Sequence, residues 1–201
     1  MTTKDHAYEG DDPGKMRVPP DLPQHAWQFA AIRHQGQRYP GTELPYLVHI
    51  GAVLLNLLPV LQEMPLLDSA LAQCCAILHD TVEDTNTTGD EIRAQFGEQV
   101  AAGVLALTKD KTLEKRLSML DSLRRIRMQP REIWMVKLAD RTANLGEAPV
   151  HWTREKCLAY AEEGQLILDA LGGVSEVLAK RLSERITAWK TKYVEQSSLR
   201  R

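Results

Sequence analysis

An apolar run over residues 71–78 leads directly into four ionisable residues, and this junction constrains the fold more than any other feature of the sequence. The four are His79, Asp80, Glu83 and Asp84. At these spacings they lie along one edge of a helix and can converge on one point. Three carboxylates and an imidazole at the end of a buried helix repel one another unless a cation neutralises them. A His-Asp pair alone is usually a capping or surface feature, but the full cluster predicts a metal site with catalytic carboxylates.

The composition is that of an ordinary one-domain globular protein. The chain has 201 residues, of which 43% are hydrophobic and 26% charged, and a formal net charge of -2. This balance gives no general reason to expect nucleic acid or a membrane as a partner. The most apolar stretch, 50–61, is interrupted by Asn56 and Pro59 and is shorter than the roughly 20 residues of a membrane span. Without a signal segment or paired cysteine motif, we expect a cytoplasmic protein with reduced cysteines.

Apolar residues recur at helical spacing through most of the chain, so the sequence predicts an all-α, compact single domain of several helices. Residues 1–23 are charged and proline-rich, which predicts a flexible leader. The domain is expected over 24–195, followed by a frayed tail at 196–201. The expected helices are approximately 24–34, 45–58, 68–84, 88–96, 98–107, 119–126, 132–145, 153–171 and 175–193.

Two further residues are candidates for the metal site. His49 lies on the first turns of an apolar helix, where a lone histidine is more often a core residue, but the later acid cluster makes it a candidate ligand. Asp140 lies on a helix that is apolar nearly all round, with Asn144 four residues later. An unpaired buried aspartate costs several kcal/mol, so Asp140 needs a partner. Lys137, Arg141 and a cation all remain open at this point.

Basic residues are concentrated between 109 and 131, with eight basic and three acidic side chains. A solvated helix face explains most of them. Lys109 and Lys111, in the loop that enters this helix, are candidates for contact with a phosphate group. Lys156 and Tyr160, four residues apart, are expected to present a polar edge to the same site.

The order of these residues resembles the HD-domain superfamily of metal-dependent phosphohydrolases. It is most similar to the hydrolase module of the RelA/SpoT family, which degrades the alarmones ppGpp and pppGpp. The matching motifs are HDTVEDT at 79–85 and VKLADRTANL at 136–145, with shorter blocks at 34–37, 45–49, 96–97 and 107–113. The resemblance covers roughly 24–171. The long members of the family continue into a synthetase domain, for which we expect no room in this chain, so the chain resembles the stand-alone small alarmone hydrolases.

The resemblance implies a role for each matched residue. The implied metal ligands are His49, His79, Asp80 and Asp140, with Mn²⁺ as the family's usual ion; this ligand set also suits Fe²⁺, Co²⁺ or Zn²⁺. Glu83 and Asp84 are the implied catalytic acids, which orient and deprotonate a metal-activated water or protonate the leaving oxygen. The implied substrate contacts are Asn144 on the sugar and Lys111, Lys137, Lys156 and Tyr160 on phosphates and nucleotide. Family members commonly have a basic residue two positions after the Gln of the first loop, whereas here Gln37 is followed by Arg38 and then Tyr39. Tyr39 is suited to stacking on a base instead.

The activity implied is hydrolysis of the 3′-pyrophosphate of (p)ppGpp to GDP or GTP and pyrophosphate. The substrate would be a small-molecule nucleotide. The same chemistry on (pp)pApp, on the 2′-phosphate of NADPH or on a pyrophosphorylated RNA 3′ end stays open, although nucleic acid is not the favoured partner. A catalytically silent nucleotide sensor is the alternative of another class, and the full set of acids and histidines argues against it. The oligomeric state is not determined by the sequence.

Overall fold

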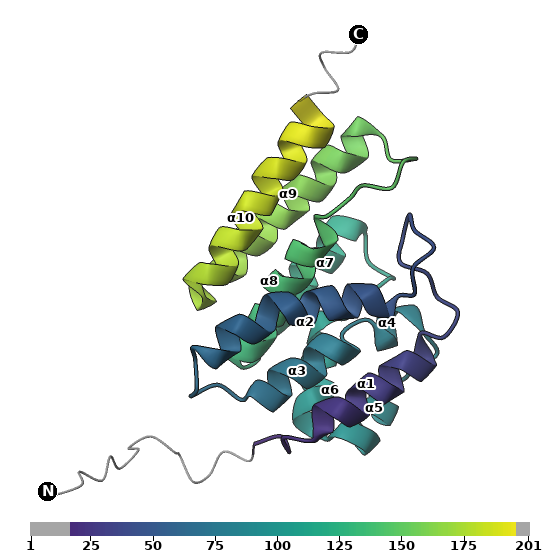
Figure 1. Cartoon of the computed structure of the whole chain (residues 1–201), viewed down its shortest axis with the longest axis vertical. Helices are drawn as coiled ribbons and strands as arrows, with labels where there is room; N and C mark the ends of the chain where they lie inside the picture. Colours follow the sequence, from purple (N-terminus) through teal and green to yellow (C-terminus); the bar gives the residue numbers. More distant parts are fainter. Residues whose placement is uncertain (1–16, 196–201) are drawn as a thin grey trace, which may run out of the picture.

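The computed structural model describes residues 17–195, which fold into α-helices without a β-strand (Figure 1). One isolated antiparallel bridge joins Arg38 and Pro45. The prediction of an all-α fold is confirmed. The α-helices are α1 (Leu22–Arg33), α2 (Leu47–Gln62), α3 (Ser69–Leu78), α4 (Thr81–Asp84), α5 (Gly89–Phe96), α6 (Glu98–Leu107), α7 (Lys115–Arg127), α8 (Arg131–Asn144), α9 (Arg154–Leu171) and α10 (Glu176–Lys190). A 3₁₀ turn, η1 (Gly172–Val174), precedes α10, and a π-helical turn, η2 (Thr191–Glu195), follows it.

Helix α8 is the centre of the fold. It packs against α2 and α3 on one side and against α9 and α10 on the other. Ten of its residues, from Glu132 to Thr142 with the exception of Trp134, are buried. Such all-round burial agrees with the nearly continuous apolar pattern of this segment. The site residue Asp140 is therefore carried by the most enclosed element of the molecule.

The segment 68–84 is not the single helix that the sequence predicts. Asp68 caps it as expected, accepting a 2.9 Å hydrogen bond from the Leu71 amide. The helix ends at Leu78, because Nδ1 of His79 bonds the Ala76 carbonyl at 2.8 Å and the Thr81 hydroxyl donates to the Leu78 carbonyl at 2.7 Å. Side chains thus occupy carbonyls at the helix end. The four-residue α4 then begins after Asp80, so the four ionisable residues do not share one helix edge.

The folded part of the chain includes residues before 24. Val18 is buried, and its amide donates a 2.9 Å hydrogen bond to Oδ2 of Asp68. Helix α1 already begins at Leu22, with Pro23 in its first turn, where the missing amide hydrogen has no helical partner to lose. The rest of the expected leader, 1–16, and the expected tail, 196–201, lie outside the described residues.

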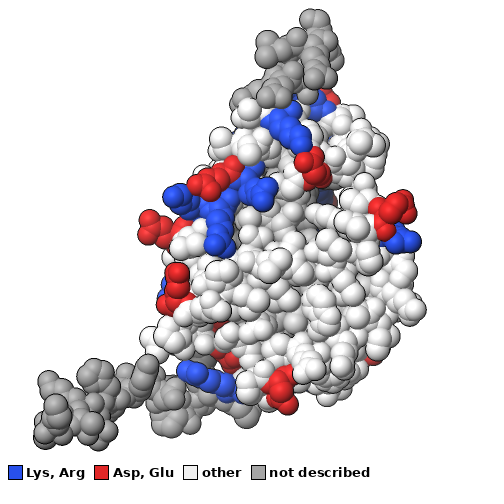
Figure 2. All heavy atoms as spheres, in the orientation of Figure 1, with Lys and Arg blue, Asp and Glu red and all other residues white. Residues whose placement is uncertain are grey.

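The surface carries both signs of charge. On the face shown in Figure 2, the main group of Lys and Arg lies over α10 and has acidic side chains beside it. A large part of this face bears no charged side chain (Figure 2). Between residues 17 and 195, no helix is both long and apolar enough to cross a membrane.

Candidate metal and catalytic site

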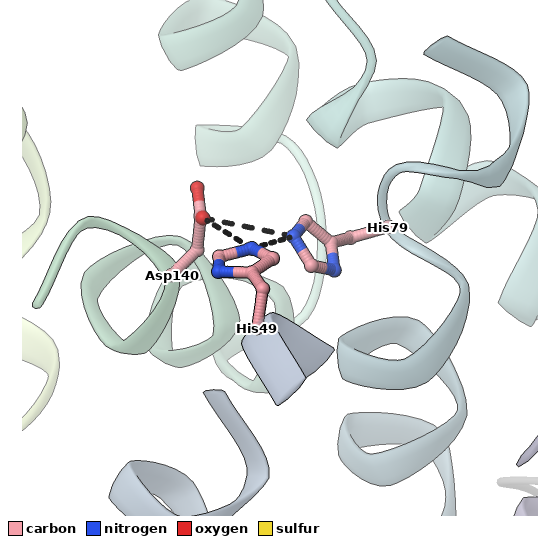
Figure 3. Close-up of side chains that lie close together, drawn as sticks. All are labelled: His49, His79 and Asp140. Carbon is pink, nitrogen blue, oxygen red and sulfur yellow. Dashed lines mark hydrogen bonds and ion pairs between the residues drawn. The ribbon is translucent and has the colours of Figure 1, made fainter. Parts of the chain in front are cut away.

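Three buried side chains from three different helices meet at one point (Figure 3). His49 comes from the first turn of α2, His79 from the end of α3 and Asp140 from α8. Nε2 of His49 lies 3.2 Å from Nε2 of His79, and Oδ1 of Asp140 lies 3.5 and 3.6 Å from these nitrogens. The side chains are almost fully enclosed, because the three residues are 1%, 3% and 4% exposed.

The spacing of these donor atoms fits a bound metal ion. A point equidistant from atoms separated by 3.2, 3.5 and 3.6 Å lies about 2.0 Å from each, which is the length of a metal bond to imidazole nitrogen or carboxylate oxygen. The Ala76 carbonyl accepts a hydrogen bond from Nδ1 of His79 and leaves the Nε2 lone pair facing the cluster. The three residues can therefore hold a divalent cation.

Asp80 lies at the edge of the same cluster. Its Oδ2 is 2.9 Å from Nε2 of His79 and 3.6 Å from Nε2 of His49. The hydroxyl of Tyr46 donates a hydrogen bond to this oxygen. The Asp80 side chain is 20% exposed, so it forms the boundary between the buried cluster and solvent.

Asp140 is held by residues of its own helix. Nζ of Lys137 lies 2.9 Å from Oδ2, and Nδ2 of Asn144 donates to Oδ1 at 2.5 Å. Arg141 instead pairs with Glu163 of α9 at 3.3 Å. Lys137, at 5% exposed, is the partner that Asp140 required, and the geometry directs its ammonium to Asp140.

The buried ionisable groups of the cluster shift one another's pKa values. Burial lowers the pKa of His79, but Asp80 and Asp140 outweigh this and raise it well above its ordinary value. The pKa of His49 is also raised, because hydrogen bonds to Asp140 and Asp80 outweigh burial. Burial raises the pKa of Asp140, yet Lys137 and the two histidines bring it well below its usual range. Protons and a metal ion therefore compete for the same nitrogens.

The two predicted catalytic acids lie one turn further along, on α4. Oε2 of Glu83 accepts a 3.0 Å hydrogen bond from the Lys109 amide, and its backbone carbonyl accepts one from Nζ of Lys111. Oδ2 of Asp84 accepts a 3.4 Å bond from the Gln37 amide, and Oδ1 lies 3.9 Å from Nζ of Lys111. Both acids are thus fixed by loop residues rather than by helix packing.

Of the remaining predicted nucleotide contacts, Tyr39 touches the cluster, whereas the contacts of Arg38 and Lys156 are with residues outside it. The Tyr39 ring stacks on His49 with centroids 5.7 Å apart, whereas Arg38 donates to the Glu43 carbonyl at 2.6 Å. Nζ of Lys156 lies 4.3 Å from the centre of the Trp152 ring. The ring of Tyr160 lies 4.3 Å from the guanidinium of Arg141, and burial raises its pKa to about 12.

Some polar residues at the site were not predicted to act there. Tyr46 holds Asp80, the Lys109 amide holds Glu83, and Gln37 contacts Asp84. Gln37 lies in the matching block at 34–37 and Tyr46 in the block at 45–49, so the family resemblance already marked both positions as candidates. Lys109 falls within the matching block at 107–113, where its side chain is the predicted phosphate contact, whereas the contact with Glu83 is made by its backbone amide.

Comparison with known proteins identifies the family of the chain. A family model described as the HD domain matches residues 26–174. The chain belongs to the HD-domain family, which confirms the resemblance based on the sequence motifs.

Individual relatives of the chain are named as hydrolases of guanosine alarmones. The chain is 33% identical over 168 residues to guanosine-3′,5′-bis(diphosphate) 3′-pyrophosphohydrolase MESH1 of Xenopus tropicalis, covering 78% of this chain and 88% of that protein. It is 35% identical over 170 residues to the Homo sapiens MESH1, with the same two coverages. A solved structure described as a metazoan ortholog of SpoT that hydrolyzes ppGpp has a TM-score of 0.72 and 27% identity, covering 86% of this chain and 98% of that chain.

Proposed function

We propose that this protein is a metal-dependent (p)ppGpp 3′-pyrophosphohydrolase, which converts guanosine alarmones to GDP or GTP and pyrophosphate. The observation that carries the proposal is the position of two acids, Glu83 and Asp84, one turn from a buried cluster of metal donors. The similarity to MESH1 enzymes supports the choice of substrate.

Four side chains would hold the metal: His49, His79, Asp80 and Asp140. We propose Mn²⁺ as the ion, because two imidazoles and two carboxylates form a mixed nitrogen and oxygen donor set that suits it. When bound, such an ion supplies positive charge that makes a water molecule more acidic and neutralises phosphate oxygens. Lys137 and Asn144 keep Oδ1 of Asp140 directed at the cluster through their own hydrogen bonds.

Glu83 and Asp84 would move the protons of the reaction. In the hydrolysis, a water oxygen bonds to the phosphorus attached to the ribose 3′ oxygen, and the bond between that phosphorus and the 3′ oxygen breaks. One acid accepts the proton that the water loses, and a proton is delivered to the departing 3′ oxygen. The Lys109 amide fixes Oε2 of Glu83, so its carboxylate is oriented before substrate arrives.

The substrate contacts would come from residues around the rim. Lys111 is 67% exposed beside Asp84 and can meet phosphate oxygens. Tyr39, which stacks on His49, and Asn144, which bonds Asp140, would offer an aromatic and a polar group to the nucleotide, and Lys156 and Tyr160 of α9 are proposed as further contacts. Lys137 is 5% exposed and its ammonium lies 2.9 Å from Asp140, so we assign it to positioning Asp140.

Product analysis tests the function directly. The purified protein is incubated with Mn²⁺ and, in separate reactions, with ppGpp, pppGpp, pppApp, NADPH and a pyrophosphorylated RNA 3′ end. We expect GDP or GTP plus pyrophosphate, and a chelator should abolish the reaction. Turnover of pppApp, NADPH or RNA without turnover of the guanosine alarmones would overturn the substrate assignment, and tight nucleotide binding without any turnover would indicate a sensor.

We also propose that the protein works in the cytoplasm, where alarmone nucleotides and reduced thiols occur together. Its three cysteines, Cys74, Cys75 and Cys157, are buried and unpaired, which suits a reducing compartment. Fractionation of cells that express the full chain would test this location.

A further inference from the structure

The connection between α1 and α2 supports both Asp80 and Asp84. It is closed by backbone hydrogen bonds, from the Gln37 amide to the His34 carbonyl and from the Tyr46 amide to the Gln37 carbonyl, each 3.0 Å long. From this frame, the Tyr46 hydroxyl reaches Asp80 and the Gln37 side chain reaches Asp84. A single short segment thus contacts one candidate metal ligand and one candidate catalytic acid.

The hydrogen-bond chemistry of this segment allows one arrangement. The Asp84 carboxylate offers only acceptor atoms, so Gln37 must present its amide nitrogen to Asp84. The other end of the same amide, Oε1, then faces Nδ1 of His34 at 2.7 Å. Because Oε1 is an acceptor, Nδ1 must carry the proton. The ring of His34 therefore determines which way the Gln37 amide is turned.

The surroundings of His34 favour this neutral form. The residue is 4% exposed, and burial lowers the pKa of its imidazole. Its Nε2 is enclosed and has no hydrogen-bond partner among the described residues, so a proton there would be an unsatisfied buried donor. The ring stacks on Tyr46 with centroids 4.7 Å apart, which fixes its plane.

We infer that His34 and Gln37 are positioning residues that orient the Asp84 carboxylate for the reaction. His34 holds the Gln37 amide in one orientation, and Gln37 donates to Oδ2 of Asp84. The inference rests on the proposed function, in which Asp84 moves a proton. The side-chain hydrogen bonds of the two residues run to each other and to Asp84, and His34 is linked to Asp80 through its ring contact with Tyr46. Removing the Gln37 donor should therefore change the rate of the reaction and not metal binding.

The tautomer of His34 can be measured without any substrate. Nitrogen-15 NMR of the full-length protein, loaded with diamagnetic Zn²⁺ in place of Mn²⁺ and with His34→Asn used to assign the signal, should show a neutral ring protonated at Nδ1. A ring protonated at Nε2 would require the Gln37 amide to be reversed, which would place an oxygen against Asp84 and overturn the inference.

Kinetics then test whether Gln37 acts through Asp84. Gln37→Met keeps the length of the side chain but removes the donor, and should lower kcat about tenfold, the usual effect of one lost hydrogen bond to a charged group, with metal content unchanged. In an Asp84→Ala background the same substitution should have no further effect, because residues that act as a unit are not additive. An equal loss in both backgrounds, or full activity of Gln37→Met, would overturn the inference.

A matched pair of variants tests His34. Asparagine places a donor near the position of Nδ1, whereas leucine has a similar size without a donor. Both remove the aromatic contact with Tyr46, so packing loss is common to them. We expect His34→Asn to retain most of the activity and His34→Leu to match Gln37→Met. Equal activity of His34→Asn and His34→Leu would overturn the role of the donor.

Failure of the inference can be told apart from failure of the proposed function. If the wild-type protein hydrolyses no alarmone, the proposed function fails, while the NMR result still decides the arrangement of His34 and Gln37.

Discussion

The metal-donor cluster and the acid pair on α4 are neighbours in the chain, but they are held in different ways. His49, His79 and Asp140 project from α2, α3 and α8, and all three side chains are buried. Glu83 and Asp84 lie on a four-residue helix and are fixed by side chains and amides of two loops. If the donors bind the metal and the acids move protons, as we propose, metal binding depends on core packing and proton transfer depends on contacts at the surface. Substitutions in one region should then leave the function of the other intact.

Removing the buried carboxylate should give the largest effect. Asp140→Ala deletes one metal donor and leaves the Lys137 ammonium buried without its partner. We expect loss of metal and activity together with a loss of about 3–5 kcal/mol in the free energy of unfolding. Metal analysis measures the first loss, the hydrolysis assay the second, and chemical denaturation the change in the free energy of unfolding.

The double variant Lys137→Met/Asp140→Asn is the control for this prediction. It removes the buried pair together, so stability should largely return while metal binding stays lost. Asp80→Ala should also lose metal and activity, with less loss of stability because Asp80 is partly exposed. Metal retained by Asp140→Ala would contradict the proposed ligand set.

Substitution of Glu83 on α4 should lower activity without lowering metal content. Glu83→Gln keeps an oxygen to accept the Lys109 amide hydrogen but removes the ionisable group. We expect kcat to fall by roughly 10²–10⁴, the usual contribution of a general acid or base, with a full complement of metal. If Glu83→Gln loses metal and activity to the same extent, Glu83 contributes to metal binding, and the two regions do not have separate functions.

The stability of the metal-free protein should depend on pH through the histidines. The pKa values of His49 and His79 are raised in the folded protein, so their contribution is fully present below the unfolded value of 6.5 and is lost as pH rises above it. After chelation, we expect Tm to fall as pH is raised from 6 toward 9, by about 2–4 °C for each kcal/mol lost.

Added Mn²⁺ should reverse this trend. The metal replaces protons on the imidazoles, so it should raise Tm more at pH 8 than at pH 5.5. Asp80 and Asp140 have lowered pKa values, and their contribution is instead lost at low pH, as pH falls through those lowered values. A metal-free Tm that rises between pH 6 and 9 would contradict the charge arrangement of the cluster.

The smallest effect is expected at the rim. Lys111→Met should change the free energy of unfolding by less than about 0.5 kcal/mol, because this lysine is largely exposed. If Lys111 meets substrate phosphates, KM should rise while kcat changes little. Lys115→Met is the matched control, since Lys115 is 70% exposed and pairs with Glu163 at 3.9 Å, and its KM should stay unchanged.

Local features of the site could be predicted from the sequence to a large extent. The contacts of Asp140 with Lys137 and Asn144 follow from three- and four-residue spacing on a helix, and the Asp68 cap follows from its side chain. The break after Leu78 could not be predicted, because an apolar run gives the same pattern whether or not His79 and Thr81 bond the last carbonyls. The contact between the Lys109 amide and Glu83 could not be predicted either, because a backbone amide is available at almost every residue and the path of the loop decides which one meets the carboxylate.

By itself, the sequence determined the helical fold and the central place of α8, and it supplied the residue types of the proposed metal and acid groups, because helical periodicity and ligand chemistry act over a few residues. Only the tertiary structure decided that the His49 and His79 nitrogens lie 3.2 Å apart, that Asp80 is held by Tyr46, and that Asp84 is reached by Gln37. These contacts join segments 30 or more residues apart, and their geometry depends on how helices pack against one another rather than on the order of residues within each helix.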